Sequence, residues 1–212
     1  PTKGIWAEAH VIGAPKWLGT SVGHYKFCAT MRQYIPLGTP KVVFAYRLAY
    51  QGFFGNAPWY AMPVYTTMGP KPDYDGLGGY RTVRGIMLNR VQGLHTGFYN
   101  AEIRYRFIDF KLFNQNIAFA VSGFTDGTHV FKDYDMSMSE AKRAELAATA
   151  PNKLALYDQY VFADKKDGFH GSAGAGLRFI MNENFIVAFE YARCFNKQDG
   201  DGAFYINIGF LF

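Results

Sequence analysis

The sequence predicts an all-β fold, a transmembrane antiparallel β-barrel with eight strands in this chain, on three observations. Apolar and polar residues alternate strictly in eight segments, which is typical of strands with one apolar and one polar face. Most of these segments are about nine to eleven residues long, the length that a tilted strand needs to cross a bilayer. The 212 residues include 20 Phe, 15 Tyr and 23 Gly, yet no apolar run of about eighteen residues could form a helical span.

The clearest alternation is in residues 98–107. Asn100, Glu102 and Arg104 share one face of this segment, and Tyr99 and Ile103 lie on the other. Successive side chains of a strand point to opposite faces, so the segment has one polar and one apolar wall. The same pattern predicts the other strands, at 4–12, 24–34, 42–52, 116–124, 168–180, 184–193 and 203–212.

The composition of the polar face favours a membrane barrel. It mixes Glu, Arg, Asn and His with many Gly, Ala and Ser, which suits a crowded lumen better than an open solvated surface. Aromatic residues also lie at strand ends, where the interfacial girdles of membrane barrels are found. The alternative is a soluble β-sandwich or ligand-binding barrel, whose apolar face points inward.

The connections alternate between short and long. Short turns are expected at 35–40, 108–115 and 181–183, and long connections at 53–93 and 125–167. Outer-membrane barrels show the same asymmetry, with short turns on one side and long loops on the other. We therefore expect residues 1–212 to form one barrel domain, with loop 53–93 folding inward and 125–167 forming a long outer loop.

One segment departs from the β pattern. Residues 137–150 predict a short helix, because Ser137 and Glu140 have capping-box spacing and Pro151 is expected to end it. This helix is either an addition to the outer loop or an element that docks a partner.

The 53–93 connection contains GLGGYRTVRGI at 76–86. Four glycines beside an arginine suggest a hairpin that folds back into the interior. The glycine spacing matches neither the P-loop nor the dinucleotide fingerprint, and no strand and helix flank it in the required order.

These residues resemble the signature of the BamA/TamA outer-membrane assembly family, the bacterial surface antigen barrels. In that family a GG-x-x-x-[VI]RG-[FY] hairpin tip folds into the barrel lumen. The matching positions are Gly78, Gly79, Val83, Arg84, Gly85 and Ile86, of which Ile86 stands where the family has an aromatic residue.

Four other segments resemble family elements in the family's order. Residues 1–4 resemble a P-x-x-G strand start, 100–104 an N-x-E-x-R strand and 124–126 an F-x-D element, although the following glycine comes one position early. The chain end resembles a C-terminal β-signal, with Ile208, Gly209, Phe210 and Phe212 as its members. The resemblance therefore covers the whole chain.

The resemblance implies an architecture and a place in the cell. Family barrels have sixteen strands, and the inward loop joins the eleventh and twelfth, so this chain corresponds to strands nine to sixteen, the C-terminal half. The first half and any periplasmic POTRA domains would lie outside this sequence. The aromatic-rich style resembles compact Bacteroidetes-type members that lack POTRA domains. The implied location is the bacterial outer membrane.

The implied function is outer-membrane protein insertion or translocation, without enzymatic activity or a cofactor. The implied partners are the lipid bilayer, outer-membrane protein clients or assembly-machinery subunits, and the missing half of the barrel. The alternatives are a passive pore or structural barrel, or the barrel part of a patatin-type lipase.

Arg84 is the strongest candidate for a functional residue. A guanidinium carried into a lumen must be paired, since an unpaired buried charge costs several kcal/mol, and its planar fork suits carboxylates. Glu102 and Asp126 are the available inward carboxylates, so we expect Arg84 to pair with one or both. The alternative is that Arg84, like Arg81, lies in solvent on a mobile loop.

The last strand is the second functional candidate. Ile208, Phe210 and Phe212 share one face of segment 203–212, which we expect to contact lipid. An unpaired strand edge can template an incoming strand, and related assembly factors use this seam in that way. The alternative is that Phe212 only anchors the strand at the interface.

Other classes of site have little support. The five His residues do not lie at metal-ligand spacing, and Ser172 in GSAGAG only superficially resembles a hydrolase elbow. Cys28 and Cys194 are free thiols or a disulfide, and neither has the neighbours of a metal site. The net charge of +5 is spread out, so no nucleic-acid-binding surface is predicted.

Overall fold

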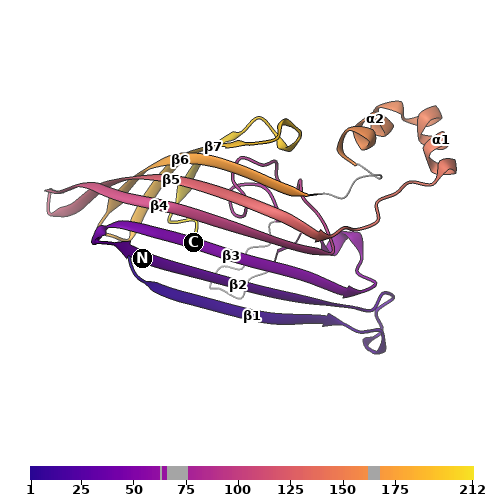
Figure 1. The fold of residues 1–212 in the computed structure, drawn as a ribbon, viewed down its shortest axis with the longest axis horizontal. Helices are drawn as coiled ribbons and strands as arrows, with labels where there is room; N and C mark the ends of the chain where they lie inside the picture. The colour runs from indigo at the N-terminus through magenta and orange to yellow at the C-terminus, as the bar shows by residue number, and fades with distance from the viewer. Residues whose placement is uncertain (63, 66–75, 162–167) are drawn as a thin grey trace.

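The computed structural model describes residues 1–62, 64–65, 76–161 and 168–212. It contains one antiparallel sheet of eight strands, in which every strand pairs with its neighbour in sequence. The sheet curves like part of a barrel wall, and β1 and β8 form its two edges (Figure 1). The strands are β1 (Gly4–Ala14), β2 (His24–Leu37), β3 (Thr39–Gly55), β4 (His95–Leu112), β5 (Gln115–Lys132), β6 (Phe169–Met181), β7 (Phe185–Cys194) and β8 (Ala203–Ile208).

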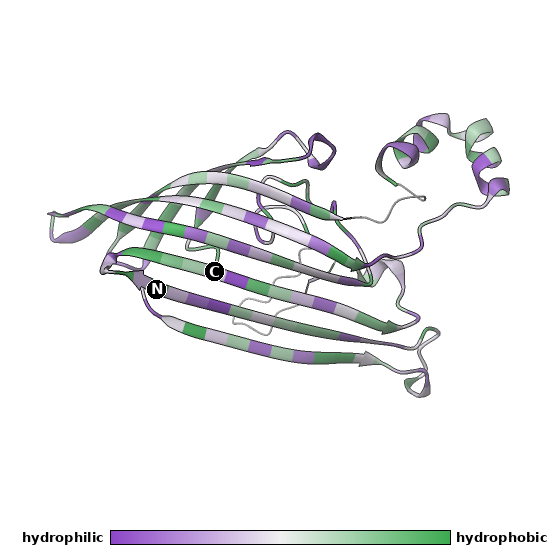
Figure 2. Ribbon diagram, in the orientation of Figure 1, coloured by the Kyte–Doolittle hydropathy of each residue, from purple (hydrophilic) through white to green (hydrophobic). Residues whose placement is uncertain are grey.

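The two faces of the sheet have opposite chemistry. Along each strand hydrophilic and hydrophobic residues alternate (Figure 2). The concave face buries many polar and charged side chains, among them Arg47, Glu102 and Arg178, while large apolar side chains on the convex face are exposed. This is the reverse of a soluble domain, where apolar residues are buried. The described residues form a single sheet with its polar face inward, so the soluble β-sandwich alternative is wrong.

The first five strands are longer than the alternation predicts, β4 and β5 most of all. β4 and β5 have 18 residues each and meet in a turn of only Phe113 and Asn114, both with positive φ. Two such residues match the twist of the flanking strands. The far end of β4 was missed because a bulge between Arg106 and Ile108 shifts the register by one residue, which reverses the alternation beyond it.

The long connections are also shifted. The β3–β4 connection is 56–94 instead of 53–93, and the β5–β6 connection is 133–168 instead of 125–167. Within the part of the chain that the structure describes, no helix combines the length and apolar character needed to cross a membrane.

The outer loop contains two helices where one was predicted. They are α1 (Glu140–Thr149) and α2 (Pro151–Tyr160), and they stand away from the sheet (Figure 1). Ser139, not Ser137, caps α1 by accepting a hydrogen bond from the Lys142 amide. Pro151 begins α2 instead of only ending α1, because the first turn of a helix needs no amide donor at that position.

The C-terminal strand is shorter than predicted. It ends at Ile208, which is 80% exposed on the convex face, and Gly209 then turns the chain with a φ of 97°. Phe212 is only 5% exposed, and its carbonyl oxygen accepts a hydrogen bond of 3.4 Å from Arg104 Nη2. The expectation that Phe210 and Phe212 contact lipid is therefore wrong.

The inward turn has a physical reason. Gly209 adopts a φ of 97°, a conformation that glycine reaches without strain and that lets the chain leave the sheet. The Phe210 ring then lies 4.5 Å from the Arg104 guanidinium and packs against an apolar cluster that includes Ala118 and Ile180. Such cation–π contacts strengthen when they are desolvated.

Candidate functional site

The candidate site lies on the concave face, where residues 76–91 fold back towards the sheet. We call these residues the inner loop. Its two arms meet in an antiparallel bridge between Leu77 and Val91, and the Gly79 amide donates to the Ile86 carbonyl at 2.9 Å. The Thr82 hydroxyl accepts a hydrogen bond from the Gly78 amide at 3.0 Å. The inner loop is therefore a tight hairpin with its own internal hydrogen bonds.

Two glycines of the motif are required by their surroundings. Gly78 has a φ of 110°, and a Cβ atom there would lie 2.0 Å from the Met87 carbonyl oxygen. Gly85 has a φ of 87°, and its Cβ would lie 3.1 Å from the backbone of Ala192 on β7. A left-handed backbone and a close approach both favour glycine. These residues let the loop tip lie directly against the wall.

Arg84 is completely buried at the tip of the inner loop. Its Nε and Nη2 atoms donate to the two carboxylate oxygens of Asp126 at 2.8 and 3.0 Å. Its Nη1 atom donates to Glu102 at 3.4 Å and to Glu190 at 3.0 Å. The structure thus brings Arg84 together with both carboxylates considered from the sequence, and adds Glu190 as a third.

The F-x-D element on β5 contributes two contacts to Arg84. Asp126 accepts from the Arg84 backbone amide at 3.0 Å as well as from its side chain. Two residues earlier, the Phe124 ring centroid lies 3.4 Å from the guanidinium carbon. Burial disfavours the charge on Arg84, but the neighbouring carboxylates outweigh this and raise its pKa above the ordinary value. The guanidinium therefore stays charged.

Two further arginines connect the carboxylates to one another. Arg104 Nε donates to Glu102 at 2.8 Å, and Arg178 Nη2 lies 2.7 Å from Glu102 and 2.6 Å from Glu190. Three cations thus alternate with three anions. We call this set the charged cluster: Arg84, Arg104, Arg178, Glu102, Asp126 and Glu190. Removing any one member would leave a buried charge without full compensation.

The strands also bind the backbone of the inner loop. Ser172 on β6 donates its hydroxyl hydrogen to the Arg84 carbonyl, and the side-chain amide Nδ2 of Asn100 on β4 donates to the Thr82 carbonyl at 2.7 Å. The Gly85 amide donates to the Tyr205 hydroxyl on β8 at 2.9 Å. The loop therefore contacts strands that are far apart in the sequence.

Sequence reasoning did not single out Glu190, Ser172 or Tyr205 as site residues. Alternation puts Ser172 and Glu190 on the polar faces of segments 168–180 and 184–193, and this is the only signal that the sequence offers for them. Alternation shows on which face of the sheet a side chain lies, but not which residues of the neighbouring strands lie beside it. These neighbours follow from the strand register, which pairs Asp126 with Ser172.

The other residues of the motif take apolar or peripheral places. Val83 and Ile86 are buried in an apolar cluster that includes Phe98 and Cys194. An aliphatic side chain therefore fills the place where the family has an aromatic one. Arg81 is half-buried, and its Nε donates to the Tyr80 hydroxyl at 2.7 Å.

The residues considered for other chemistry do not meet in a second site. Cys28 and Cys194 are both buried, and the two do not form a disulfide. His170 lies 2.9 Å from both carboxylate oxygens of Asp199. Among the described residues, no group of three His, Cys, Asp or Glu side chains is arranged to hold a metal ion.

Two comparisons with known proteins give matches. The family model for the Omp85 superfamily domain matches residues 1–212. Among solved structures, the chain is similar to BamA from Haemophilus ducreyi lacking POTRA domains 1–3, with a TM-score of 0.55 and 19% identity over 97% of this chain. This chain spans 38% of the length of that BamA chain, and at this identity the likeness shows the fold. No match was found among curated proteins.

Proposed function

Because the chain belongs to the Omp85 superfamily, we propose that it is the C-terminal part of an outer-membrane barrel that inserts or translocates other outer-membrane proteins. The membership confirms the resemblance to BamA/TamA-type barrels. The proposal assigns the chain to the bacterial outer membrane and gives it neither an enzymatic role nor a cofactor. Residues 1–212 then form one barrel domain, with β1 and β8 as family strands nine and sixteen.

The observation that carries this proposal is the weak pairing of β8. This edge strand has 6 residues, against 18 in each of β4 and β5. In the proposed complete barrel its outer edge would face the first strand of the missing half, so an open seam would expose it. An open edge of unpaired amides and carbonyls is a template for another strand. The short ladder makes β8 the strand that most easily changes its neighbours.

The charged cluster supports the same function, because it holds β4 to β7 together and leaves β8 outside this set of ion pairs. Its carboxylates lie on β4, β5 and β7, and its arginines on β4, β6 and the inner loop. β8 contributes no member, and it contacts the inner loop through the Tyr205 hydroxyl. In our proposal the wall stays intact when β8 separates from a neighbouring strand and pairs with a client protein.

Depletion of the protein in its host tests this function. We expect the levels of other β-barrel proteins in the outer membrane to fall, as measured by quantitative mass spectrometry of outer-membrane fractions. Unchanged levels would eliminate the assembly role and favour the passive pore or structural barrel. Restoring the wild-type protein should restore the levels, which controls for indirect effects of the depletion.

A further inference from the structure

The turn between β7 and β8, residues 195–202, carries one fully buried carboxylate. Asp199 is the only buried residue of the short 3-10 helix Lys197–Asp199, and its exposed fraction is 0%. Residues 195–198 before it are exposed. A charge that is buried without partners is costly inside a protein, so the partners of Asp199 must come from other elements.

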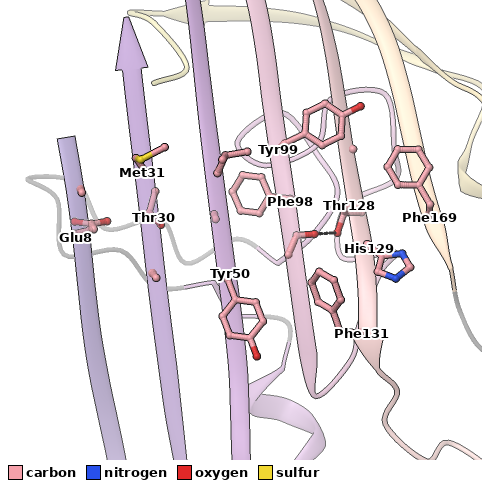
Figure 3. Close-up of a pocket in the computed structure, with 16 residues that line it drawn as sticks. Glu8, Thr30, Met31, Tyr50, Phe98, Tyr99, Thr128, His129, Phe131 and Phe169 are labelled. Atoms are coloured by element: carbon pink, nitrogen blue, oxygen red, sulfur yellow. Dashed lines mark hydrogen bonds between the residues drawn. The ribbon is translucent and has the colours of Figure 1, made fainter. Parts of the chain in front are cut away.

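Two elements supply side chains to Asp199. On β6 the Phe169 ring stacks on Tyr99 of β4 on the convex face (Figure 3), so the next residue, His170, points to the concave face. Its Nδ1 atom lies 2.9 Å from each carboxylate oxygen of Asp199, and because a carboxylate only accepts hydrogen bonds, His170 is the donor. From the inner loop, Arg90 Nε lies 3.7 Å from Asp199 Oδ1. Asp199 therefore joins β6 to the inner loop.

The backbone of the turn also binds the inner loop. The Met87 amide donates to the Asp199 carbonyl at 2.9 Å. Arg90 Nε donates to the Gln198 carbonyl at 3.3 Å. Together with the two side-chain contacts of Asp199, these hydrogen bonds form what we call the clasp. The clasp thus connects the turn to the inner loop through both side-chain and backbone atoms.

The clasp lies at the start of the strand that changes partners in the proposed function. β8 begins at Ala203, four positions after Asp199. Four residues span at most about 14 Å, so fixing Asp199 limits how far the start of β8 can move. Gly202 keeps this path close to β7, because a Cβ atom there would lie 2.6 Å from the Ala192 carbonyl oxygen. Since Arg84 fixes the inner loop to the wall, the clasp connects the start of β8 to the part of the barrel that stays in place.

We propose that Asp199 is a positioning residue that holds the start of β8 against the inner loop, and that release of the clasp frees β8 to pair with a client strand. This inference rests on the proposed function and adds a control to it. The contacts suit a restraint that opens, because most of the turn is exposed and water can replace its hydrogen bonds when it lifts away. The charged cluster stays buried and paired during this movement.

Hydrogen exchange measures the restraint in the full-length protein reconstituted in liposomes. Asp199→Asn keeps the shape of the side chain and removes its charge. We expect the β8 amides to exchange at least about tenfold faster, the effect of losing one hydrogen bond to a charged group, with the β4–β5 amides unchanged. The matched control Asp201→Asn makes the same substitution at an exposed position of the same turn and should leave β8 exchange unchanged. Equal β8 exchange in the two variants would overturn the proposal.

A double-mutant cycle tests whether the inner loop is the other half of the clasp. If Arg90 acts through Asp199, the combined variant Arg90→Gln/Asp199→Asn should exchange more slowly than the product of the two single effects predicts, because both substitutions remove the same contact. Independent effects would show that Arg90 acts elsewhere and would overturn the connection between the turn and the inner loop.

Insertion of a client distinguishes a restraint from a role in stability alone. The same liposomes would receive an unfolded outer-membrane barrel protein, and protease protection would follow its folding. Asp199→Asn should raise the initial rate by up to the same factor of about ten, because pairing needs the open state. An unchanged or lower rate would overturn the role of the clasp. If the wild-type protein inserts no client, the proposed function fails, while the exchange rates still decide whether Asp199 holds β8.

Discussion

Arg84 and Asp126 are joined by three hydrogen bonds, two from the guanidinium and one from the Arg84 backbone amide. The pair connects the tip of the inner loop to the middle of β5, 42 residues further along the chain. Both side chains are fully buried, so the bonds form in a medium of low dielectric constant. This contact determines where the loop lies inside the curved sheet.

Asp126→Asn removes the negative charge while keeping the shape of the side chain. Arg84 would retain Glu102 and Glu190, but the charged cluster would carry an excess positive charge. We expect the free energy of unfolding to fall by about 3 kcal/mol, the scale for breaking a buried ion pair. Urea titration in lipid vesicles would measure it. The control Asp135→Asn alters an exposed carboxylate and should have little effect; equal losses would contradict the assignment.

Arg84→Lys keeps the charge but loses the planar fork. A lysine cannot donate to both oxygens of Asp126 and also reach Glu190. We expect the inner loop to become accessible to a protease that does not cut the wild-type protein. Arg143→Lys is the matched control, because Arg143 pairs with Asp158 on the exposed helices, where ion pairs contribute about 0–1 kcal/mol. Unchanged protection in Arg84→Lys would show that charge alone holds the loop.

Gly85→Ala tests the close approach of the loop to β7. The substitution adds both backbone strain and a contact with Ala192, whereas Gly19→Ala adds strain alone, since Gly19 has a φ of 84° and a Cβ there would meet no atom within 4 Å. We expect Gly19→Ala to cost about 1 kcal/mol, the scale for an L-residue in the left-handed region, and Gly85→Ala clearly more, both by urea titration. Equal losses of stability in the two variants would mean that β7 shifts at Ala192 to accommodate the added methyl group.

Fluorescent labels on the last residues test the inward turn after β8. A label on Ile208→Cys should be quenched by spin-labelled lipid, because Ile208 is exposed on the convex face. A label on Phe212→Cys should be shielded, because Phe212 is buried beside Arg104 and Arg47. Equal quenching of both labels would show that the strand continues along the wall. The variant Gly209→Val should expose position 212, since valine disfavours the required φ of 97°.

Most of the strand pattern could be predicted, and each error has a local cause. Residues 98–107 lie within β4, because alternation with a period of two depends on neighbouring residues only. The far end of β4 was missed at the bulge after Arg106, where the period is interrupted. The inward turn was missed at Gly209, because Phe210 and Phe212 continue the alternation although the chain has left the sheet.

The sequence by itself determined which side chains belong to the polar wall and that Arg84 needed a buried partner. The face on which a side chain lies and its charge depend only on the residue and its neighbours in the sequence. Only the tertiary structure decided that Glu190 and Ser172 also meet the inner loop, and that Phe212 lies against Arg104. These contacts join residues up to 108 positions apart. Their meeting depends on the register and curvature of eight strands together, which no local pattern specifies.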